Sequence, residues 1–307
     1  MKSVVIAGGS GIVGSRLSNI LKKAGYSVFI LTRNKVKTQK LELFIHWDIE
    51  NGIIDDQFAE ADIIINMAGS GIAEGRWTTK RKKEAINSRL DTTQLLISEV
   101  KKRKMNIDSY ISASAIGYYG DGGDKLLREE DGVQTDEFLS QVCVAWEDAA
   151  SKASSITDKV CILRIGTVLS PSGGALEKMD ITVPFGVANY IGNGKQLLSW
   201  IHLDDLCQMV QHCMEQPLNG IYNAVAPEVI SNKDFARSLR DVINPKALVL
   251  PAPAFGVKMI FGEMARVVLN SSNVSADKIQ AAGFKFSYPT IDQALRQLYP
   301  SKKSSAS

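Results

Sequence analysis

Hydrophobic and polar positions follow two distinct patterns along the first part of the chain. Residues 4–7 are a short apolar run, which is typical of a strand covered on both faces of a parallel sheet. Apolar side chains then recur at helical spacing over residues 12–21, and a second apolar run spans residues 27–31. This order of patterns predicts a βαβ unit at the start of the chain.

The alternation of strand and helix patterns continues further along the chain. Later strands are predicted over residues 109–115, 159–170 and 220–225, with helices over residues 76–103 and 135–154. Strands that alternate with helices form parallel sheets. We therefore predict an α/β fold built on a Rossmann-type doubly wound parallel sheet.

A glycine-rich turn joins the first predicted strand to the first predicted helix. Its sequence, GGSGIVG, satisfies both GxGxxG and GxxGxxG spacing. Glycine permits a tight turn and a close approach of a pyrophosphate, and the helix N-terminus provides amide donors. We therefore predict that a dinucleotide contacts Gly8, Gly9, Ser10, Gly11, Ile12, Val13 and Gly14.

The end of the second predicted strand indicates which dinucleotide is bound. NAD-selective enzymes of this kind usually place an acid there for the ribose 2′-hydroxyl, whereas this chain has Thr32 and Arg33. A guanidinium can bind a 2′-phosphate through charge-assisted hydrogen bonds, so NADP(H) is the predicted cofactor. The alternative is a surface arginine that simply follows a strand.

Two further strand ends carry candidate cofactor contacts. The stretch ADIIINMAG predicts a buried strand and then a turn, at the sheet edge where ligands collect in open α/β folds. We predict that Met67, Ala68 and Gly69 of this turn contact the cofactor. Asp48, at the end of the preceding strand, is either an adenine acceptor or a plain turn residue.

Charge and composition narrow the class of partner. Lys and Arg exceed Asp and Glu by 36 − 33 = 3 in 307 residues, so charge does not favour nucleic acid or an anionic membrane. The basic stretch at residues 80–83 fits a solvated helix face better than a polyanion site. No apolar segment approaches the length of a membrane span. We expect a cytoplasmic protein with a small-molecule substrate and with no nucleic-acid or membrane partner.

The cysteines are scattered along the chain, without the short paired spacing of metal sites or redox dithiols. We therefore predict no metal site and four buried free thiols, at Cys143, Cys161, Cys207 and Cys213.

Several segments, taken together and in order, resemble the extended short-chain dehydrogenase/reductase superfamily, which includes nucleotide-sugar epimerases and dehydratases. They are GGSGIVG, NMAG, SASAIGYYG, LRIGTVLS and GNGKQLLSWIHLDDL, and the resemblance covers nearly the whole chain. More narrowly, residues 269–295 resemble the C-terminal region of the atypical "epimerase family" branch.

The resemblance implies a smaller C-terminal α/β substrate domain beside the sheet. We expect residues 1–170 and 220–225 in the NADP-binding Rossmann domain, and residues 171–219 and 226–300 in the substrate domain. Residues 301–307 are polar and are expected to form a disordered tail.

The chain also departs from the superfamily pattern. Members generally have a Tyr and a Lys four residues apart in the helix predicted at residues 135–154, and a Glu four residues after the Lys. Counting back from Glu147 puts Cys143 in the Lys position and Leu139 in the Tyr position. In the superfamily the Tyr exchanges a proton with the substrate hydroxyl, and neither substitute can do this. The atypical branch resembles this chain in having FLxxVCxxWE here.

Three residues near the end of the strand at 109–115 are candidates for the missing proton transfer. Ser114 stands where the superfamily's substrate-bonding Ser or Thr lies, and the alternative is a local turn bond. Tyr118 and Tyr119 follow in GYYG, and stacking or core packing is the alternative for both. Cys143 fits a small core residue better than a thiol acid.

Roles are expected in three further places. Glu84 and Arg89 lie one helical face apart in KEAINSRL, and the resemblance implies that both contact the cofactor, with Arg89 supplying the donor that the missing Lys no longer offers. His202 fits a structural role better than that of a general base. Residues 251–269 predict a core helix that forms one wall of the substrate cleft.

These observations predict an NADP(H)-binding oxidoreductase or epimerase-like enzyme. It would act by hydride transfer on an unidentified small molecule, such as a nucleotide sugar or a related carbonyl or alcohol. The alternative is a catalytically silent NADP(H) sensor or regulatory module, and a structural interaction protein is a third interpretation. The sequence indicates neither the substrate nor the oligomeric state.

Overall fold

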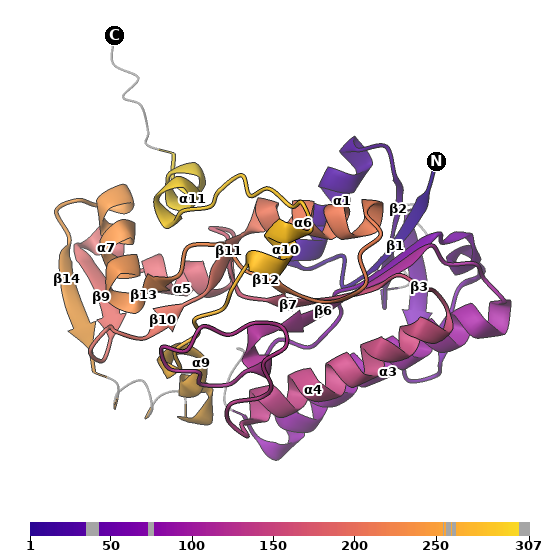
Figure 1. Ribbon diagram of the computed structural model, residues 1–307, viewed down its shortest axis with the longest axis horizontal. Coiled ribbons are helices and arrows are strands. Elements are labelled where there is room, and N and C mark those ends of the chain that lie inside the picture. Colours follow the sequence, from indigo (N-terminus) through magenta and orange to yellow (C-terminus); the bar gives the residue numbers. More distant parts are fainter. Residues whose placement is uncertain (35–42, 73–76, 254, 256–258, 260–261, 301–307) are drawn as a thin grey trace, which may run out of the picture.

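The computed structural model describes residues 1–34, 43–72, 77–253, 255, 259 and 262–300. Within these ranges the larger lobe is built on an eight-stranded sheet in the order β12-β7-β6-β5-β1-β2-β3-β4 (Figure 1). Neighbouring strands are parallel except for β3 and β4. The strands are β1 (Ser3–Ala7), β2 (Ser27–Thr32), β3 (Phe44–Asp48), β4 (Ile53–Ile54), β5 (Ile63–Asn66), β6 (Ser109–Ala115), β7 (Val160–Ile165) and β12 (Gly220–Ala224).

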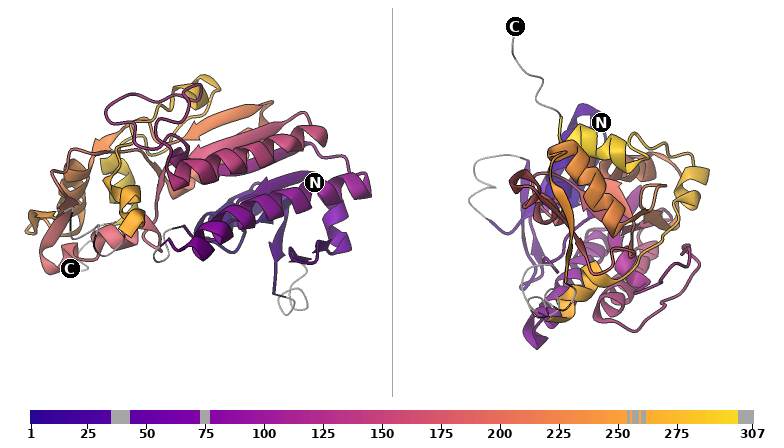
Figure 2. Two further views of the ribbon diagram at one scale, coloured as in Figure 1. Left: turned by 90° about the horizontal axis from the view of Figure 1, so that it is seen from below. Right: turned by 90° about the vertical axis from the view of Figure 1, so that its left-hand side faces the viewer.

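Helices cover both faces of this sheet, so the predicted doubly wound architecture is confirmed. Helices α1 (Ile12–Lys23) and α6 (Leu203–Glu215) pack together on one face, and α3 (Thr79–Arg103) and α4 (Phe138–Ser151) on the other (Figures 1 and 2). Helix α3 begins three residues later than predicted because the Thr78 side chain accepts a hydrogen bond from the Arg81 amide and caps it.

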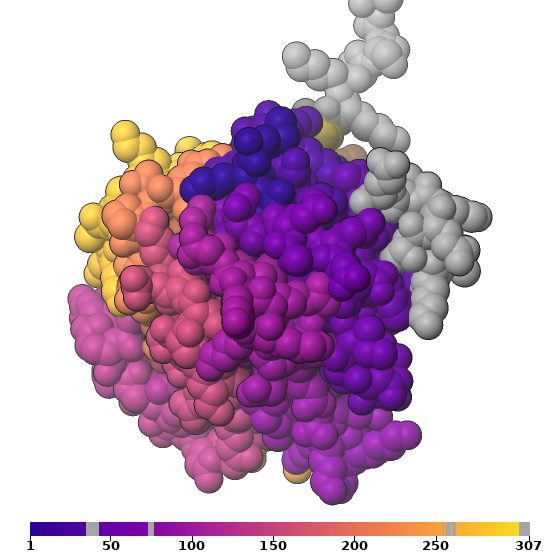
Figure 3. Space-filling view, turned by 90° about the vertical axis from the view of Figure 1, so that its right-hand side faces the viewer, coloured from indigo at the N-terminus to yellow at the C-terminus, as the bar shows by residue number. Residues whose placement is uncertain are grey.

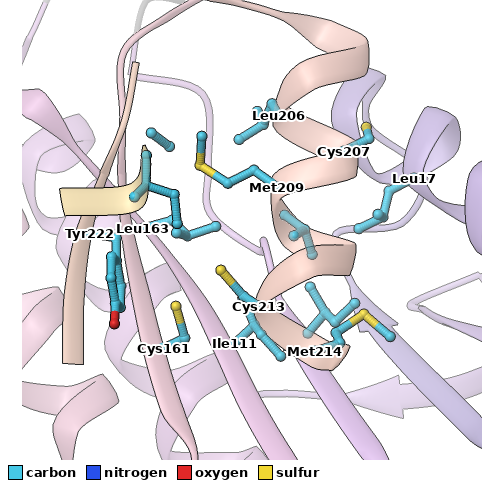
Figure 4. Packing of buried hydrophobic residues seen from close by; sticks show 14 of the residues in the cluster. Leu17, Ile111, Cys161, Leu163, Leu206, Cys207, Met209, Cys213, Met214 and Tyr222 are labelled. Atoms are coloured by element: carbon cyan, nitrogen blue, oxygen red, sulfur yellow. The ribbon is translucent and has the colours of Figure 1, made fainter. Parts of the chain in front are cut away.

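The core on the α1/α6 face contains residues from almost the whole chain. Figure 4 shows Cys213 and Met209 of α6 pointing toward Cys161 and Leu163 of β7, with Leu17 of α1 on the other side of α6. All four cysteines are buried and unpaired, as predicted. The indigo-to-magenta surface of the first part of the chain covers most of the end of the molecule that faces away from the smaller lobe (Figure 3).

The smaller lobe begins where the chain leaves the large sheet at Gly166. A Cβ at this position would lie 2.8 Å from Val225 Cγ1 and 2.9 Å from the Ser199 carbonyl oxygen. The single strand predicted over residues 159–170 is therefore split, and its second part pairs in a different sheet. The smaller lobe contains β8 (Thr167–Leu169), α5 (Ala175–Asp180), β9 (Val187–Ile191), β10 (Leu197–Leu198), β11 (Trp200–His202), β13 (Ile230–Ser231), α7 (Asn232–Ile243), β14 (Leu248–Ala252), α9 (Arg266–Leu269) and α11 (Ile291–Leu298).

Its strands form three two-stranded sheets within the described residues: β8 with β11, β9 with β14 and β10 with β13. A separate buried core holds Trp200, Phe235, Leu239 and Leu295. Short 3₁₀ turns cover residues 56–60, 116–118, 152–155, 183–185 and 262–265.

The predicted domain boundaries differ from the packing in two places. Helix α6 falls in the range assigned to the substrate domain, but it packs on α1, and Arg16 Nε donates to Asp204 Oδ1 over 2.6 Å. Helix α10 (Asp277–Ala281) lies against β12, and Ile279 and Phe284 are part of the larger lobe's core. Both segments therefore belong structurally to the Rossmann lobe.

The core helix predicted over residues 251–269 is not continuous in the part that the structure describes, although residues 255 and 259 are helical. Residues 251 and 252 end strand β14, and residues 262–269 form a 3₁₀ turn followed by one helical turn, α9. Phe255 and Met259 are exposed. The segment does not start as a helix, because residues 251 and 252 pair with residues 190 and 191 of β9.

Candidate functional site

The glycine turn lies between β1 and α1, next to the turn that follows β5. Gly8 has φ +81°, and a Cβ there would lie 2.6 Å from the Met67 carbonyl oxygen. A Cβ at Gly14 would lie 2.5 Å from Gly9 Cα, and one at Gly9 would lie 2.7 Å from Ile30 Cγ2. These three glycines are required by the packing of the protein itself.

Gly11 differs from the other glycines of the turn. It is the N-cap of α1, and a Cβ there would meet a single described atom within 4 Å, the Gly8 carbonyl oxygen at 3.4 Å. The space beside it leads to the first-turn amides of α1, which include those of Ile12 and Val13, and no acidic side chain lies in that turn. Helix N-termini of this kind bind phosphates, so the turn fits a pyrophosphate.

Arg33 follows directly after β2, on the same edge of the sheet. Its side chain is exposed and forms no hydrogen bond or ion pair with the described part of the chain. The Thr32 hydroxyl accepts a hydrogen bond from the Asn34 amide. Arg33 is therefore available to an anionic ligand at the end of β2.

The hydrogen bonds of Asp48 are those of a turn residue and not those of an adenine contact. Its Oδ1 accepts from the Asn51 amide at 3.2 Å and its Oδ2 from Asn51 Nδ2 at 2.9 Å. These bonds to Asn51 lower the pKa of the carboxyl group. The adenine contact has no support from this geometry.

The turn after β5 is held in place by Asn66, which is fully buried. Asn66 Nδ2 donates to Thr93 Oγ1 and to the Tyr110 hydroxyl, and Asn66 Oδ1 accepts from the Ala68 amide. Because Ala7 and Asn66 are paired in the sheet, residues 67–69 lie beside the glycine turn. The predicted contacts at both turns are thus brought together.

Arg89 reaches this turn from α3. A Cβ at Gly69 would lie 2.8 Å from Arg89 Cζ, and the guanidinium lies 4.6 Å from the ring centre of Trp146 on α4. Arg89 is 7% exposed, and burial lowers its pKa. Its Nη1 donates to the Ala85 and Ser70 carbonyl oxygens, but its Nε has no partner among the described residues.

The Glu84 side chain does not point toward the turn that Arg89 reaches. Five residues separate it from Arg89, which turns the two side chains about 140° apart on an α-helix. Glu84 is exposed and lies 4.0 Å from Lys80 on the solvent side of α3. The position of the Glu84 side chain therefore does not support the predicted cofactor contact.

A cavity of about 240 Å³ opens beside Arg89, between the two lobes. Leu139 and Cys143 line it, so the positions that hold Tyr and Lys in the superfamily do face the expected space. Burial raises the pKa of Cys143 to about 12, which keeps the thiol neutral at physiological pH. The larger lobe also contributes Ala115, Gly117, Val142 and Trp146, and the smaller lobe contributes Arg266, Val267, Asn270 and Ser272.

Ser114 does not line this cavity and takes part in a buried polar network. Its hydroxyl donates to Glu147 Oε1 at 2.7 Å, and Arg164 donates to both oxygens of Glu147 at 2.9 Å. Ser114, Glu147 and Arg164 are 2%, 7% and 1% exposed. Ser114 thus binds within the protein, and the substrate contact predicted for it is not supported.

Neither tyrosine lines the cavity, so the predicted catalytic roles of Tyr118 and Tyr119 are also not supported. The Tyr119 hydroxyl donates to Asn223 Oδ1 at 2.8 Å, and burial raises its pKa to about 12. The Tyr118 ring centre lies 3.5 Å from the Arg164 guanidinium carbon, on the side of α4 away from the cavity. Stacking and core packing, the alternatives for this pair, describe both residues.

Sequence reasoning missed several residues that the cavity brings together. Glu137 Oε2 accepts from Asn270 Nδ2 at 2.7 Å, and Arg266 Nη1 donates to Glu137 Oε1 at 3.3 Å. Trp146 Nε1 is buried and has no partner among the described residues. A signal was present for Trp146, which lies two helical turns after Leu139 and therefore on the same face of α4.

His202 is structural, as predicted. Its Nδ1 accepts from the Asp204 amide and caps α6, while Nε2 lies 2.9 Å from Gln297 Oε1 of α11. Within the described residues, no helix is both long and apolar enough to cross a membrane, and no group of three or more His, Cys, Asp or Glu is arranged to hold a metal ion.

Known proteins share both the sheet and the C-terminal region of this chain. Residues 4–224 match the NAD dependent epimerase/dehydratase family, and residues 252–298 match a domain of unknown function, DUF1731. The chain is 31% identical over 303 residues to the epimerase family protein YfhF of Bacillus subtilis, covering 98% of this chain and 99% of that protein. It is 35% identical over 297 residues to the epimerase family protein MT2273 of Mycobacterium tuberculosis, covering 95% and 96%.

A solved structure agrees with these matches over almost the full length. The crystal structure of the human epimerase family protein SDR39U1 (isoform 2) with NADPH has a TM-score of 0.87 at 27% identity, covering 97% of this chain and 99% of that one. The chain therefore belongs to the NAD dependent epimerase/dehydratase family of NAD(P)-binding proteins and carries a C-terminal DUF1731 domain.

Proposed function

We propose that the protein binds NADP(H) in preference to NAD(H) and uses it as an oxidoreductase. The observation that carries the preference is Arg33, an exposed cation without a partner in the described chain, at the strand end where NAD-selective proteins place an acid. The NADPH in the structure of the human relative supports the same cofactor.

The residues at the strand ends fit such a cofactor. The α1 amides beside Gly11 would hold the pyrophosphate, Arg33 with Thr32 would hold the 2′-phosphate, and residues 67–69 would border the dinucleotide. The partnerless Nε of Arg89 would donate to the ribose, in place of the Lys that this chain lacks. When bound, the cofactor supplies hydride chemistry.

A comparison of dissociation constants tests the proposal. Hydrogen bonds to charged groups contribute roughly 1.5 to 3 kcal/mol, so NADPH should bind about 10- to 150-fold more tightly than NADH. Arg33→Ala should remove most of this preference without changing the affinity for NADH. Arg33→Lys should keep part of it, because the charge remains but the bidentate geometry is lost.

Calorimetry on the three proteins gives the values directly. Equal dissociation constants for NADPH and NADH in the unmutated protein would contradict the assignment. A preference that survives in Arg33→Ala would show that another residue binds the 2′-phosphate.

A second candidate function is a catalytically silent NADP(H) sensor. It is favoured by the residues that replace the proton-transfer pair, because Leu139 has no exchangeable proton and the Cys143 thiol is held neutral. Firm NADPH binding without turnover on carbonyl or alcohol substrates would favour this candidate over the oxidoreductase.

A further inference from the structure

The cavity beside Leu139 has properties that restrict its ligand. At about 240 Å³ it lies below the roughly 300–1,000 Å³ of pockets that enclose drug-sized molecules. A nucleotide sugar is larger than such molecules. The cavity therefore matches a small ligand, or one small part of a larger ligand.

The charged side chains on the cavity wall interact with other groups of the protein. Arg266 lies 3.3 Å from Glu137, which also accepts a hydrogen bond from Asn270. Arg89 is the other cation on the wall among the described lining residues, and its guanidinium lies against the ring of Trp146. A diphosphate is bound through several unpaired donors or cations, and the described wall does not offer such a set.

The remaining wall is apolar, and it includes one buried donor that the cofactor does not use. Leu139, Val142, Cys143 and Val267 line the space together with Trp146, whose Nε1 has no partner among the described residues. A buried donor without a partner is costly, so a ligand with an acceptor oxygen gains from bonding to it. This pattern suits an apolar molecule with a carbonyl group.

The same wall also limits the chemistry. Reduction of an isolated ketone forms an alkoxide, which needs a positioned acid, and the superfamily's Tyr is Leu139 here. Ser114 and Tyr119 donate to Glu147 and Asn223 instead. A conjugated acceptor does not need such an acid, because its reduced anion is delocalised and can take a proton from water.

We propose that this cavity binds a small, uncharged, conjugated carbonyl compound, such as a quinone or enone, and not a nucleotide sugar. This inference rests on the proposed oxidoreductase function. For a quinone, NADPH and one proton give the hydroquinone and NADP⁺, with two electrons transferred as hydride and the proton supplied by water.

Binding of 1,4-naphthoquinone to the NADP⁺-loaded protein tests the inference. Quenching of tryptophan fluorescence should be saturable, because Trp146 lines the cavity, and UDP-glucose should give no saturable signal. Val267→Trp should weaken naphthoquinone binding by about tenfold or more by filling the cavity mouth. Val268→Trp, at the adjacent exposed position outside the lining, should change it by less than about twofold.

Steady-state NADPH oxidation provides a second readout. Naphthoquinone should be reduced, whereas 1-tetralone, a bicyclic aryl ketone that lacks the quinone's second carbonyl and the double bond between the carbonyls, should be reduced far more slowly. Saturable UDP-glucose binding that Val267→Trp abolishes would overturn the inference, as would equal effects of the two valine variants. NADPH affinity is measured separately, so failure to bind NADPH would reject the proposed function, whereas normal NADPH binding without naphthoquinone binding would reject only this inference.

Discussion

Ser114, Glu147 and Arg164 form a buried polar network in which each side chain depends on the others. The Glu147 carboxylate accepts one hydrogen bond from Ser114 and two from Arg164, and Tyr118 stacks on the guanidinium. A buried ion pair is costly to break, because the remaining charge is left without compensation in a medium of low polarity. The network therefore fixes α4 against β6 and β7, below the cavity.

Removal of one member should destabilise the protein strongly. Arg164→Met leaves the Glu147 carboxylate buried without a cation and with Ser114 as its remaining donor, and we expect a loss of about 3–5 kcal/mol in the free energy of unfolding. The double variant Arg164→Met/Glu147→Met should recover much of this loss, since no charge remains buried. Urea unfolding of the single and double variants measures both effects, and equal stability of all three proteins would contradict the role of the network.

Candidate site residues could be proposed from the sequence where their position depends on neighbouring residues. The glycine turn and Arg33 follow directly from the strand and helix patterns around them. Ser114 and Tyr119 could not be assigned in this way, because their hydroxyls are directed by Glu147 and Asn223, which lie 33 and 104 residues further along the chain. Asn270 joins the cavity only through the packing of the smaller lobe.

At the scale of elements, the glycines of the turn have two different roles. Gly14 is needed for packing, whereas Gly11 leaves space for a ligand. Gly11→Val should give a folded protein, because its Cβ meets a single described atom, but NADPH affinity should fall by more than about tenfold. Gly14→Val should lower stability itself, because its Cβ would press on Gly9 Cα. Thermal unfolding measures the stability of both variants, and calorimetry measures their NADPH affinity. Normal NADPH binding by folded Gly11→Val would show that this turn does not bind the pyrophosphate.

The elements themselves were predictable where their periodicity was uninterrupted. The strand at residues 109–115 was predicted with its observed limits, and its sequence SYISASA consists of small and apolar residues apart from Tyr110. Two predictions failed for tertiary reasons. Gly166 lets the chain change sheets within one apolar run, and residues 251 and 252 pair with β9 as the end of β14 and do not start a helix.

Across the whole molecule, His202 links the start of α6 in the larger lobe to α11 in the smaller one. Burial lowers its pKa below 6.5, although Gln297, Asp204 and Asp205 favour the charged form. As the pH falls, His202 is therefore protonated more readily in the unfolded chain than in the folded protein. Stability is fully present above about pH 6.5 and falls as the pH drops toward the lowered value in the folded state.

Urea midpoints at pH 7.5 and pH 5.5 should show this loss in the unmutated protein. His202→Asn should reduce the difference between the two pH values, because asparagine caps helices but does not titrate in this range. His46 and His212 remain in both proteins as the internal control. An unchanged pH dependence in the variant would place the proton uptake elsewhere.

Helix α10 and Phe284 complete the core of the larger lobe. Because they come late in the chain, they determine when this lobe can fold during synthesis. The first 170 residues leave the ribosome well before α6, β12 and the segment at 277–284. Until those arrive, the nascent chain exposes the edge of β7 and an apolar sheet face, which are features that chaperones bind and that promote aggregation. Translation that stops before about residue 284 is therefore expected to leave an aggregation-prone fragment and not an independent cofactor-binding domain.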